Sequence, residues 1–144
     1  MARDVLVPID RSDAARAAID FAIETYPAAT ITLLHVLNPG ELYAYWADAD
    51  DAVVNVDELV EDRRRRGEQL LADARNRVES AGLAADTVLE TGRPARAIVE
   101  YATAADIDHI VMGSHGRTGA SRILLGSVAE LVARRSPVPV TIVR

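Results

Sequence analysis

Three glycines and their neighbours form the stretch of this sequence with the clearest chemical meaning, GSHGRTGASRILLGS at residues 113–127. Gly113 and Gly116 are three residues apart, and Gly126 follows ten residues after Gly116. A backbone without side chains can take unusual dihedral angles and approach a ligand closely. Successive N–H groups in such a turn form a concave anion site. The spacing therefore predicts a site for an anionic group.

A second anion-binding element is predicted directly after Gly126. Ser127 and Glu130 have the Ser-x-x-Glu spacing of a capping box, which indicates that a helix begins at Ser127. The free N–H groups and positive dipole end of that helix favour an anion. The structural alternative stays open for both elements: the glycines only shape a turn, and Ser127 only caps a helix.

Several other classes of protein are excluded or disfavoured. All 16 basic residues are arginine, so no P-loop lysine exists, and no G-x-G-x-x-G follows the first apolar run. A net charge of −6 disfavours a nucleic-acid surface. Cysteine is absent, and the three histidines form no recognisable set of metal ligands. With no membrane-length apolar segment and no signal peptide, we expect a cytoplasmic protein.

Hydrophobic periodicity predicts strands alternating with helices in one domain over residues 1–144. Short apolar runs predict strands at 5–9, 31–36, 87–90, 110–112 and 138–143. Helices are predicted at 13–26, 55–81, 93–105 and 127–135, with Ser12 capping the first, Gly82 stopping the second and Pro94 opening the third. This alternation indicates a parallel, doubly wound α/β sheet, which binds ligands beyond the carboxyl ends of its strands.

The pattern Gly113-x2-Gly116-x9-Gly126-Ser127 resembles the G-2x-G-9x-G-[S/T] motif of ATP-binding universal stress proteins. The resemblance extends over nearly the whole chain and includes Val7-Pro8-Ile9-Asp10, Leu34-His35-Val36 and Pro137-Val138-Pro139-Val140. It implies a three-layer, Rossmann-like fold of the adenine-nucleotide α-hydrolase type. The five parallel strands of that fold have the order 3-2-1-4-5.

The resemblance also implies an adenine-nucleotide site for ATP, ADP or AMP, with Mg²⁺ held by the phosphates rather than by protein ligands. It places Asp10 on the ribose or near the base, and Pro8, Val36 and Met112 in apolar contact with adenosine. Phosphates are held mostly by backbone N–H groups of Gly113, His115, Gly116, Gly126, Ser127 and Val128. The alternatives are that Asp10 caps the next helix or turn, that the apolar residues are core, and that His115 is a solvated loop residue.

Function follows from the same resemblance. It implies a homodimeric, nucleotide-responsive regulatory protein of the stress response, paired through the edge strand at 138–143 and acting on an unidentified protein partner. A slow ATP hydrolase and a nucleotide-free interaction protein are the alternatives, and no residue is assigned a catalytic role. Efficient hydrolysis needs a positioned base and charge compensation, for which the sequence offers only Asp10 and His115.

Other side chains are weaker candidates for nucleotide binding. Arg117 and Arg122 either screen phosphates or lie in solvent, while Arg63 to Arg66 are interpreted as part of a solvated helix. His35 and His109 are interpreted as structural residues. The long loop at 38–54 contains Tyr43, Tyr45 and Trp46, which predict either a lid over the nucleotide or a local packing surface.

Overall fold

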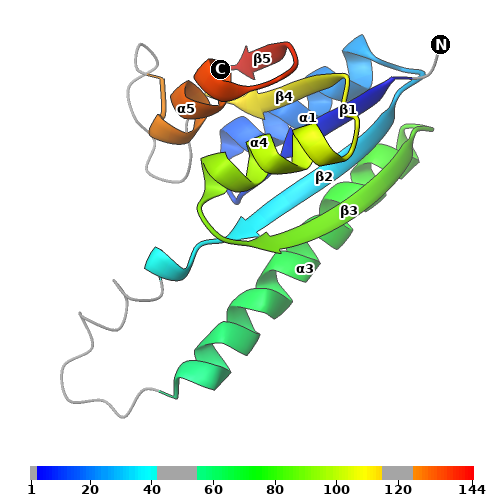
Figure 1. The fold of residues 1–144 in the computed structure, drawn as a ribbon. Helices are drawn as coiled ribbons and strands as arrows, with labels where there is room; N and C mark the ends of the chain where they lie inside the picture. Colours follow the sequence, from blue (N-terminus) through cyan, green and yellow to red (C-terminus); the bar gives the residue numbers. More distant parts are fainter. Residues whose placement is uncertain (1–2, 42–54, 115–124) are drawn as a thin grey trace.

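The computed structural model describes residues 3–41, 55–114 and 125–144. Five parallel strands form one sheet in the order β3-β2-β1-β4-β5, which confirms the predicted topology (Figure 1). They are β1 (Asp4–Pro8), β2 (Thr30–Leu37), β3 (Ala84–Thr91), β4 (His109–Gly113) and β5 (Val140–Val143). The strand order reverses between β1 and β4, because β2 and β3 extend the sheet on one side of β1 and β4 and β5 on the other.

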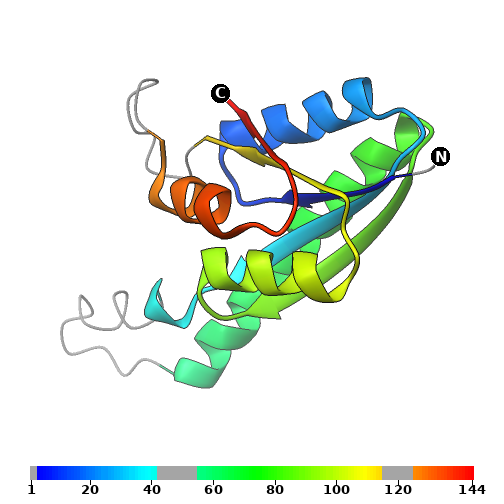
Figure 2. The same ribbon diagram turned by 45° about the horizontal axis from the view of Figure 1, so that its top comes forward.

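Helices cover both faces of this sheet (Figures 1 and 2). One face packs against α1 (Asp13–Thr25) and α3 (Val56–Ser80), and the other against α4 (Pro94–Ala104) and α5 (Ser127–Arg135). No helix in the described ranges is both long and apolar enough to cross a membrane. The three-layer arrangement predicted from the alternation of elements is therefore observed.

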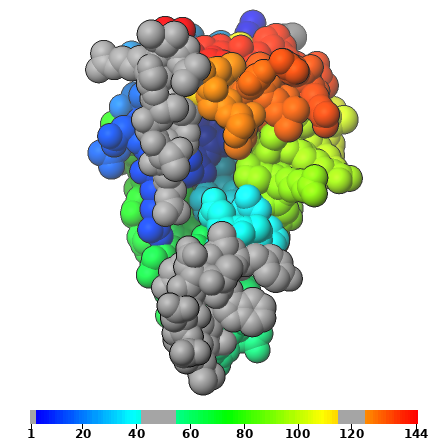
Figure 3. Space-filling view, turned by 90° about the vertical axis from the view of Figure 1, so that its left-hand side faces the viewer, coloured from blue at the N-terminus to red at the C-terminus, as the bar shows by residue number. Residues whose placement is uncertain are grey.

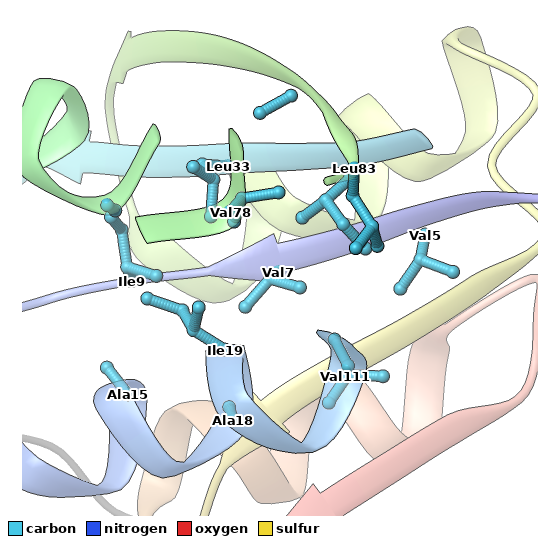
Figure 4. Close-up of a cluster of buried hydrophobic side chains, with 14 of the residues drawn as sticks. Val5, Val7, Ile9, Ala15, Ala18, Ile19, Leu33, Val78, Leu83 and Val111 are labelled. Atoms are coloured by element: carbon cyan, nitrogen blue, oxygen red, sulfur yellow. The ribbon is translucent and has the colours of Figure 1, made fainter. Parts of the chain in front are cut away.

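Strand β1 shows why the sheet is made of continuous apolar runs. Val5 and Val7 pack toward α1 and α3, as Figure 4 shows, whereas Leu6 packs toward α4 and α5. All three side chains are fully buried. A strand covered on both faces needs apolar side chains on both faces. Its sequence is therefore a continuous apolar run and does not alternate between apolar and polar residues.

Three predicted helix boundaries are confirmed. The Ser12 Oγ accepts a hydrogen bond from the Ala15 N–H (3.1 Å) and caps α1. Gly82 follows α3 with a φ of +90°, a left-handed conformation that favours glycine, and its N–H donates to the Glu79 carbonyl (2.9 Å). Pro94 is the first residue of α4, where its missing N–H has no intrahelical partner to lose.

The predicted bounds of two strands differ from the observed ones. β3 begins three residues earlier than the predicted 87–90, because it pairs with β2 from its first residue. β5 begins at Val140 rather than at residue 138. There the Ser136 hydroxyl accepts from the Val138 N–H (3.1 Å) and donates to the Val138 carbonyl (2.7 Å). These local bonds use the backbone groups that a strand would have paired.

Helix α3 is buried only along its second half. Leu71 is 4% exposed, whereas Val56 and Val60 are 45% and 42% exposed. The first turns of α3 extend past the ends of the strands, as Figure 1 shows. At Gly67 the helix lies close to the sheet, because an added Cβ would lie 3.0 Å from the His35 Cδ2.

Candidate functional site

The carboxyl ends of β1 and β4 meet where the strand order reverses, which is where open α/β sheets bind ligands. These strands pair with Leu6 opposite Ile110, so Pro8 and Met112 stand two residues farther along, at the same edge. On the other side of β1, Pro8 is opposite Leu34 of β2. Three strand ends therefore meet at one location, and α1 and α5 both begin beside it.

The apolar residues predicted to contact adenosine share one face of the sheet. Val36, Met112 and Val128 belong to the same apolar cluster; Met112 is 5% exposed, while Val36 and Val128 are half-buried. Pro8 lies two residues after Leu6, and alternation puts its side chain on that same face. The structure thus brings the three predicted adenosine contacts to one face, and Val128 of α5, which was predicted to contact the phosphates, packs beside them.

Asp10 follows β1 and has a structural role within the chain. Its Oδ1 accepts a hydrogen bond from the Ser12 N–H (2.8 Å), which closes the turn into α1. This is the turn-closing alternative that the sequence left open. Oδ2 has no hydrogen-bond partner among the described residues, and the residue is only half-buried. One carboxylate oxygen is therefore available to accept from a ligand.

The backbone that carries Asp10 is held by two hydrogen bonds from β2. The Ile9 N–H donates to the Leu34 carbonyl (2.8 Å), and the Ile9 carbonyl lies 2.8 Å from the His35 Nδ1. A carbonyl only accepts, so the His35 proton is on Nδ1. The structural role predicted for His35 is confirmed. Its positioning of the residue before Asp10 could not be read from the sequence, because the two partners are 26 residues apart.

Gly113 is required by helix packing rather than by an unusual dihedral angle. It ends β4, and it is not among the described glycines with positive φ, so the prediction of an unusual backbone conformation was wrong. A Cβ at this position meets the Ala14 Cβ at 2.7 Å and the Ala14 carbonyl carbon at 2.8 Å. The close approach that Gly113 permits is therefore that of α1.

Helix α5 begins at Ser127, as predicted, but the capping box is not formed. Gly126 is the N-cap residue, no side chain caps the helix, and Glu130 instead accepts from the Arg134 Nη2 (2.8 Å). The Gly126 N–H donates to the Ser114 carbonyl (2.6 Å), which ties the helix start to the end of β4. Within the described residues, the first-turn N–H groups that follow Gly126 have no side-chain acceptor, the property an anion requires.

Some predicted residues lie outside the described ranges. His115 and Gly116 of the motif are among them, as are Arg117 and Arg122. The three aromatic residues of the loop at 38–54 also lie outside, so the lid interpretation stays a prediction.

His109 belongs to the opposite end of β4. Its Nε2 is 2.7 Å from the Thr141 Oγ1, and its ring packs on Tyr26 with centroids 5.4 Å apart. Burial, and secondarily the positive charge of Arg3, lower the pKa of His109 below its usual range. These contacts confirm its structural role. In the described part of the chain, no three acidic, histidine or cysteine side chains are grouped to hold a metal ion.

A hollow of about 410 Å³ adjoins the start of α5, between this helix and the start of α4. Figure 3 views the molecule from the side on which the strands end, with α5 in orange and α4 in yellow-green beside it. Ser127 and Val128 line the hollow, together with Arg93, Arg96 and Arg135. Sequence reasoning missed these three arginines, because only the packing of α4 on α5 brings them together.

Comparison with known proteins decides the family. The profile of the universal stress protein family matches residues 1–144. The chain belongs to the universal stress protein family. Universal stress protein YxiE of Bacillus subtilis is 31% identical to it over 151 residues, with both chains covered in full. Universal stress protein MJ0577 of Methanocaldococcus jannaschii is 30% identical, over 100% of this chain and 96% of that protein.

Solved structures agree with this assignment. The MJ0577 structure superimposes on this universal stress protein with a TM-score of 0.82 at 30% identity, covering 98% of this chain and 94% of that one. A universal stress protein crystallised in complex with cAMP has a TM-score of 0.71 at 26% identity, with coverage of 99% and 97%. The sheet order and the two helical layers are therefore those of the family.

Proposed function

We propose that this universal stress protein is a homodimeric regulatory protein that binds ATP or a related adenine nucleotide at the carboxyl ends of β1 and β4. The observation that carries the proposal is the start of α5, which has no side-chain cap, is tied to the end of β4 and packs with Val36 and Met112. The relative crystallised with cAMP, at 26% identity, supports an adenine nucleotide as the ligand class.

Each part of the nucleotide has a chemical counterpart in this site. The adenine ring packs on Pro8, Val36 and Met112, where apolar contact and a half-buried surface suit a flat ring. A ribose hydroxyl donates to the Asp10 oxygen that the turn does not use. The phosphates accept from the N–H groups of Ser127 and Val128, aided by the positive end of the α5 dipole.

The remaining predicted contacts complete the phosphate site. His115 and Gly116 contact the phosphates, and Mg²⁺ binds to the phosphate oxygens without a protein ligand. Gly113 at the end of β4 and Gly126 at the start of α5 flank the phosphates on two sides. The Gly126 N–H itself is used by the Ser114 carbonyl, so this residue acts by leaving space rather than by donating.

Calorimetric titration with ATP, ADP, AMP, cAMP and GTP, each with and without Mg²⁺, tests this function. We expect saturable binding of the adenine nucleotides and at least about tenfold weaker binding of GTP, because an apolar base site leaves the additional carbonyl and amino groups of guanine without hydrogen-bond partners. Asp10→Asn keeps an acceptor for the Ser12 N–H but removes the charge, so it weakens binding without unfolding the turn. Absence of saturable adenine-nucleotide binding would refute the proposal, and rapid phosphate release would replace it with an enzymatic function.

The dimer is proposed to form through β5. This strand lies at the sheet edge, and its four residues are all half-buried in the single chain. An edge strand with unpaired backbone groups and apolar side chains pairs readily with a second copy. Light scattering at micromolar concentration checks this: we expect the mass of two chains, and a monomer would contradict it.

A further inference from the structure

The hollow between α4 and α5 combines positive charge with an apolar floor. Arginine side chains from both helices line it: Arg93 and Arg96 at the start of α4, and Arg135 at the end of α5. No acidic residue is among its lining residues. This is unusual for a chain with 22 acidic and 16 basic residues, in which a random patch of surface is negative on average.

Two of these arginines have no carboxylate partner. Within the described residues, Arg93 and Arg135 form no ion pair, whereas Arg96 is 2.9 Å from the Glu100 carboxylate. Arg134, the neighbour of Arg135 on α5, is paired with Glu130 at 2.8 Å and does not line the hollow. Exposed arginines without a carboxylate partner that line one concavity are suited to bind a dianion through charge-assisted hydrogen bonds.

The backbone contributes further donors. α4 has no side-chain cap at Arg93, and the N–H groups of Ala95 and Arg96 have no acceptor in the described part of the chain. The first residue, Pro94, fixes the chain direction there. Backbone donors without an acceptor therefore belong to residues that line the hollow.

The apolar side of the hollow comes from Pro94, Val128 and Leu131. Leu131 is 37% exposed, which makes it one of the few large apolar side chains with open surface among the described residues. Inorganic phosphate alone leaves this surface wet, whereas a ligand with an apolar part covers it. A volume of about 410 Å³ is in the range of sites for small organic molecules.

We propose that this hollow is a binding site for a small organic phosphate, in which Arg93 and Arg135 hold the phosphate group and Leu131 and Val128 cover its apolar part. The hollow shares Ser127 and Val128 with the proposed nucleotide position. Its arginines lie outside that position, so the proposal does not require that nucleotides bind there. Two anions near one helix start repel, so occupancy of each site lowers the affinity of the other by the same factor.

Phenyl phosphate is the probe, titrated into the nucleotide-free protein at constant ionic strength and followed by the arginine Nε–Hε resonances. Inorganic phosphate tests the charge alone and phenol tests the ring alone. We expect saturable shifts of the Arg93 and Arg135 resonances with phenyl phosphate. Binding is expected to be weaker by about tenfold for inorganic phosphate and undetectable for phenol, since each lacks one of the two contributions.

Variants identify the site. Arg93→Gln and Arg135→Gln each weaken phenyl phosphate binding about tenfold, the effect of losing one charge-assisted hydrogen bond. Arg134→Gln is the matched control on the same helix and changes the dissociation constant less than about twofold, because Arg134 is paired with Glu130 and does not line the hollow. The proposal is overturned if phenyl phosphate gives no saturable shift, if Arg134→Gln weakens binding as much as Arg135→Gln, or if phenol binds equally well.

Discussion

Helices α1 and α5 begin at the same edge of the sheet, one after β1 and the other close to the end of β4, yet their first turns differ. At α1, the Ser12 hydroxyl accepts from the Ala15 N–H, and Asp10 in turn accepts from the Ser12 N–H. At α5, Gly126 occupies the N-cap position and no side chain caps the helix. Both helix starts carry the positive end of a helix dipole. At α1 a side chain of the protein caps the first turn, whereas at α5 no side chain does.

The motif glycines also divide between stability and binding. Gly113 makes room for the Ala14 backbone of α1, so its lack of a side chain serves the fold. Gly126 has a φ of −64° and a ψ of 154°, values open to any residue, so the fold does not require glycine there. The two glycines therefore differ: Gly113 is required for the packing of α1, whereas Gly126 is the N-cap residue of α5 and leaves that helix start without a side-chain cap.

Substitution of Gly113 should have the largest effect. Gly113→Val places a side chain against Ala14 backbone atoms that cannot move without shifting α1. We expect the free energy of unfolding to fall by at least about 2 kcal/mol in urea titration. Gly40→Ala is the control, because its added Cβ meets only the flexible end of Asn38 at 3.2 Å. If Gly113→Val unfolds at the wild-type urea concentration, the packing role is wrong.

Gly126→Asp makes the start of α5 resemble that of α1. A carboxylate at the N-cap accepts from the first-turn N–H groups, so stability of the free protein stays the same or rises by a few tenths of a kcal/mol. The same carboxylate occupies the phosphate donors and repels the phosphates. We expect ATP binding measured by calorimetry to weaken at least about tenfold. Unchanged affinity would place the phosphates elsewhere.

Ser12→Ala is the converse change, at the start of α1. It removes the cap bond to the Ala15 N–H and lowers the free energy of unfolding by about 1 kcal/mol. ATP affinity stays within about twofold, because the Asp10 turn bond uses the Ser12 backbone and survives. Urea titration and calorimetry on the same preparation check the pair of results. A large loss of affinity would show that the two helix starts are not independent.

His109 gives the smallest expected effect, at the end of β4 away from the site. Its pKa is lower in the folded protein than in the unfolded chain, chiefly through burial, so the unfolded chain binds the proton more readily. Its contribution to stability is therefore complete above the unfolded pKa near 6.5 and declines as pH falls below it. We expect the thermal midpoint to fall less between pH 7.5 and 5.5 in His109→Gln than in the wild type. Equal slopes would contradict this.

Features with a local cause were predictable from the sequence. Ser12, Gly82 and Pro94 mark helix ends by their own chemistry, and the apolar runs around Val5–Val7 and Ile110 mark buried strands. Pro8, Val36 and Met112 were assigned to one site by the family resemblance, not by a local pattern. The strand order itself came from the family resemblance.

Features that depend on distant partners were not predictable. Gly113 looks like a ligand-binding glycine until α1 is packed on it. The Ser127–Glu130 spacing suits a capping box, but the N-cap is Gly126, whose N–H is bound to the Ser114 carbonyl, and Glu130 accepts from Arg134. The arginines of the hollow come from α4 and α5, and no local sequence pattern predicts that these two helices pack together. Tertiary packing decided each of these outcomes.

Backbone amide resonances during an ATP titration test the central claim most directly, because they compare the two helix starts in one experiment. We predict saturable shifts for Ser127 and Val128 at the start of α5, and for Val36 and Met112 beside it. The Ala15 amide, held by the Ser12 hydroxyl, should move far less. Saturating ATP that leaves the Ser127 and Val128 amides unmoved would contradict the account.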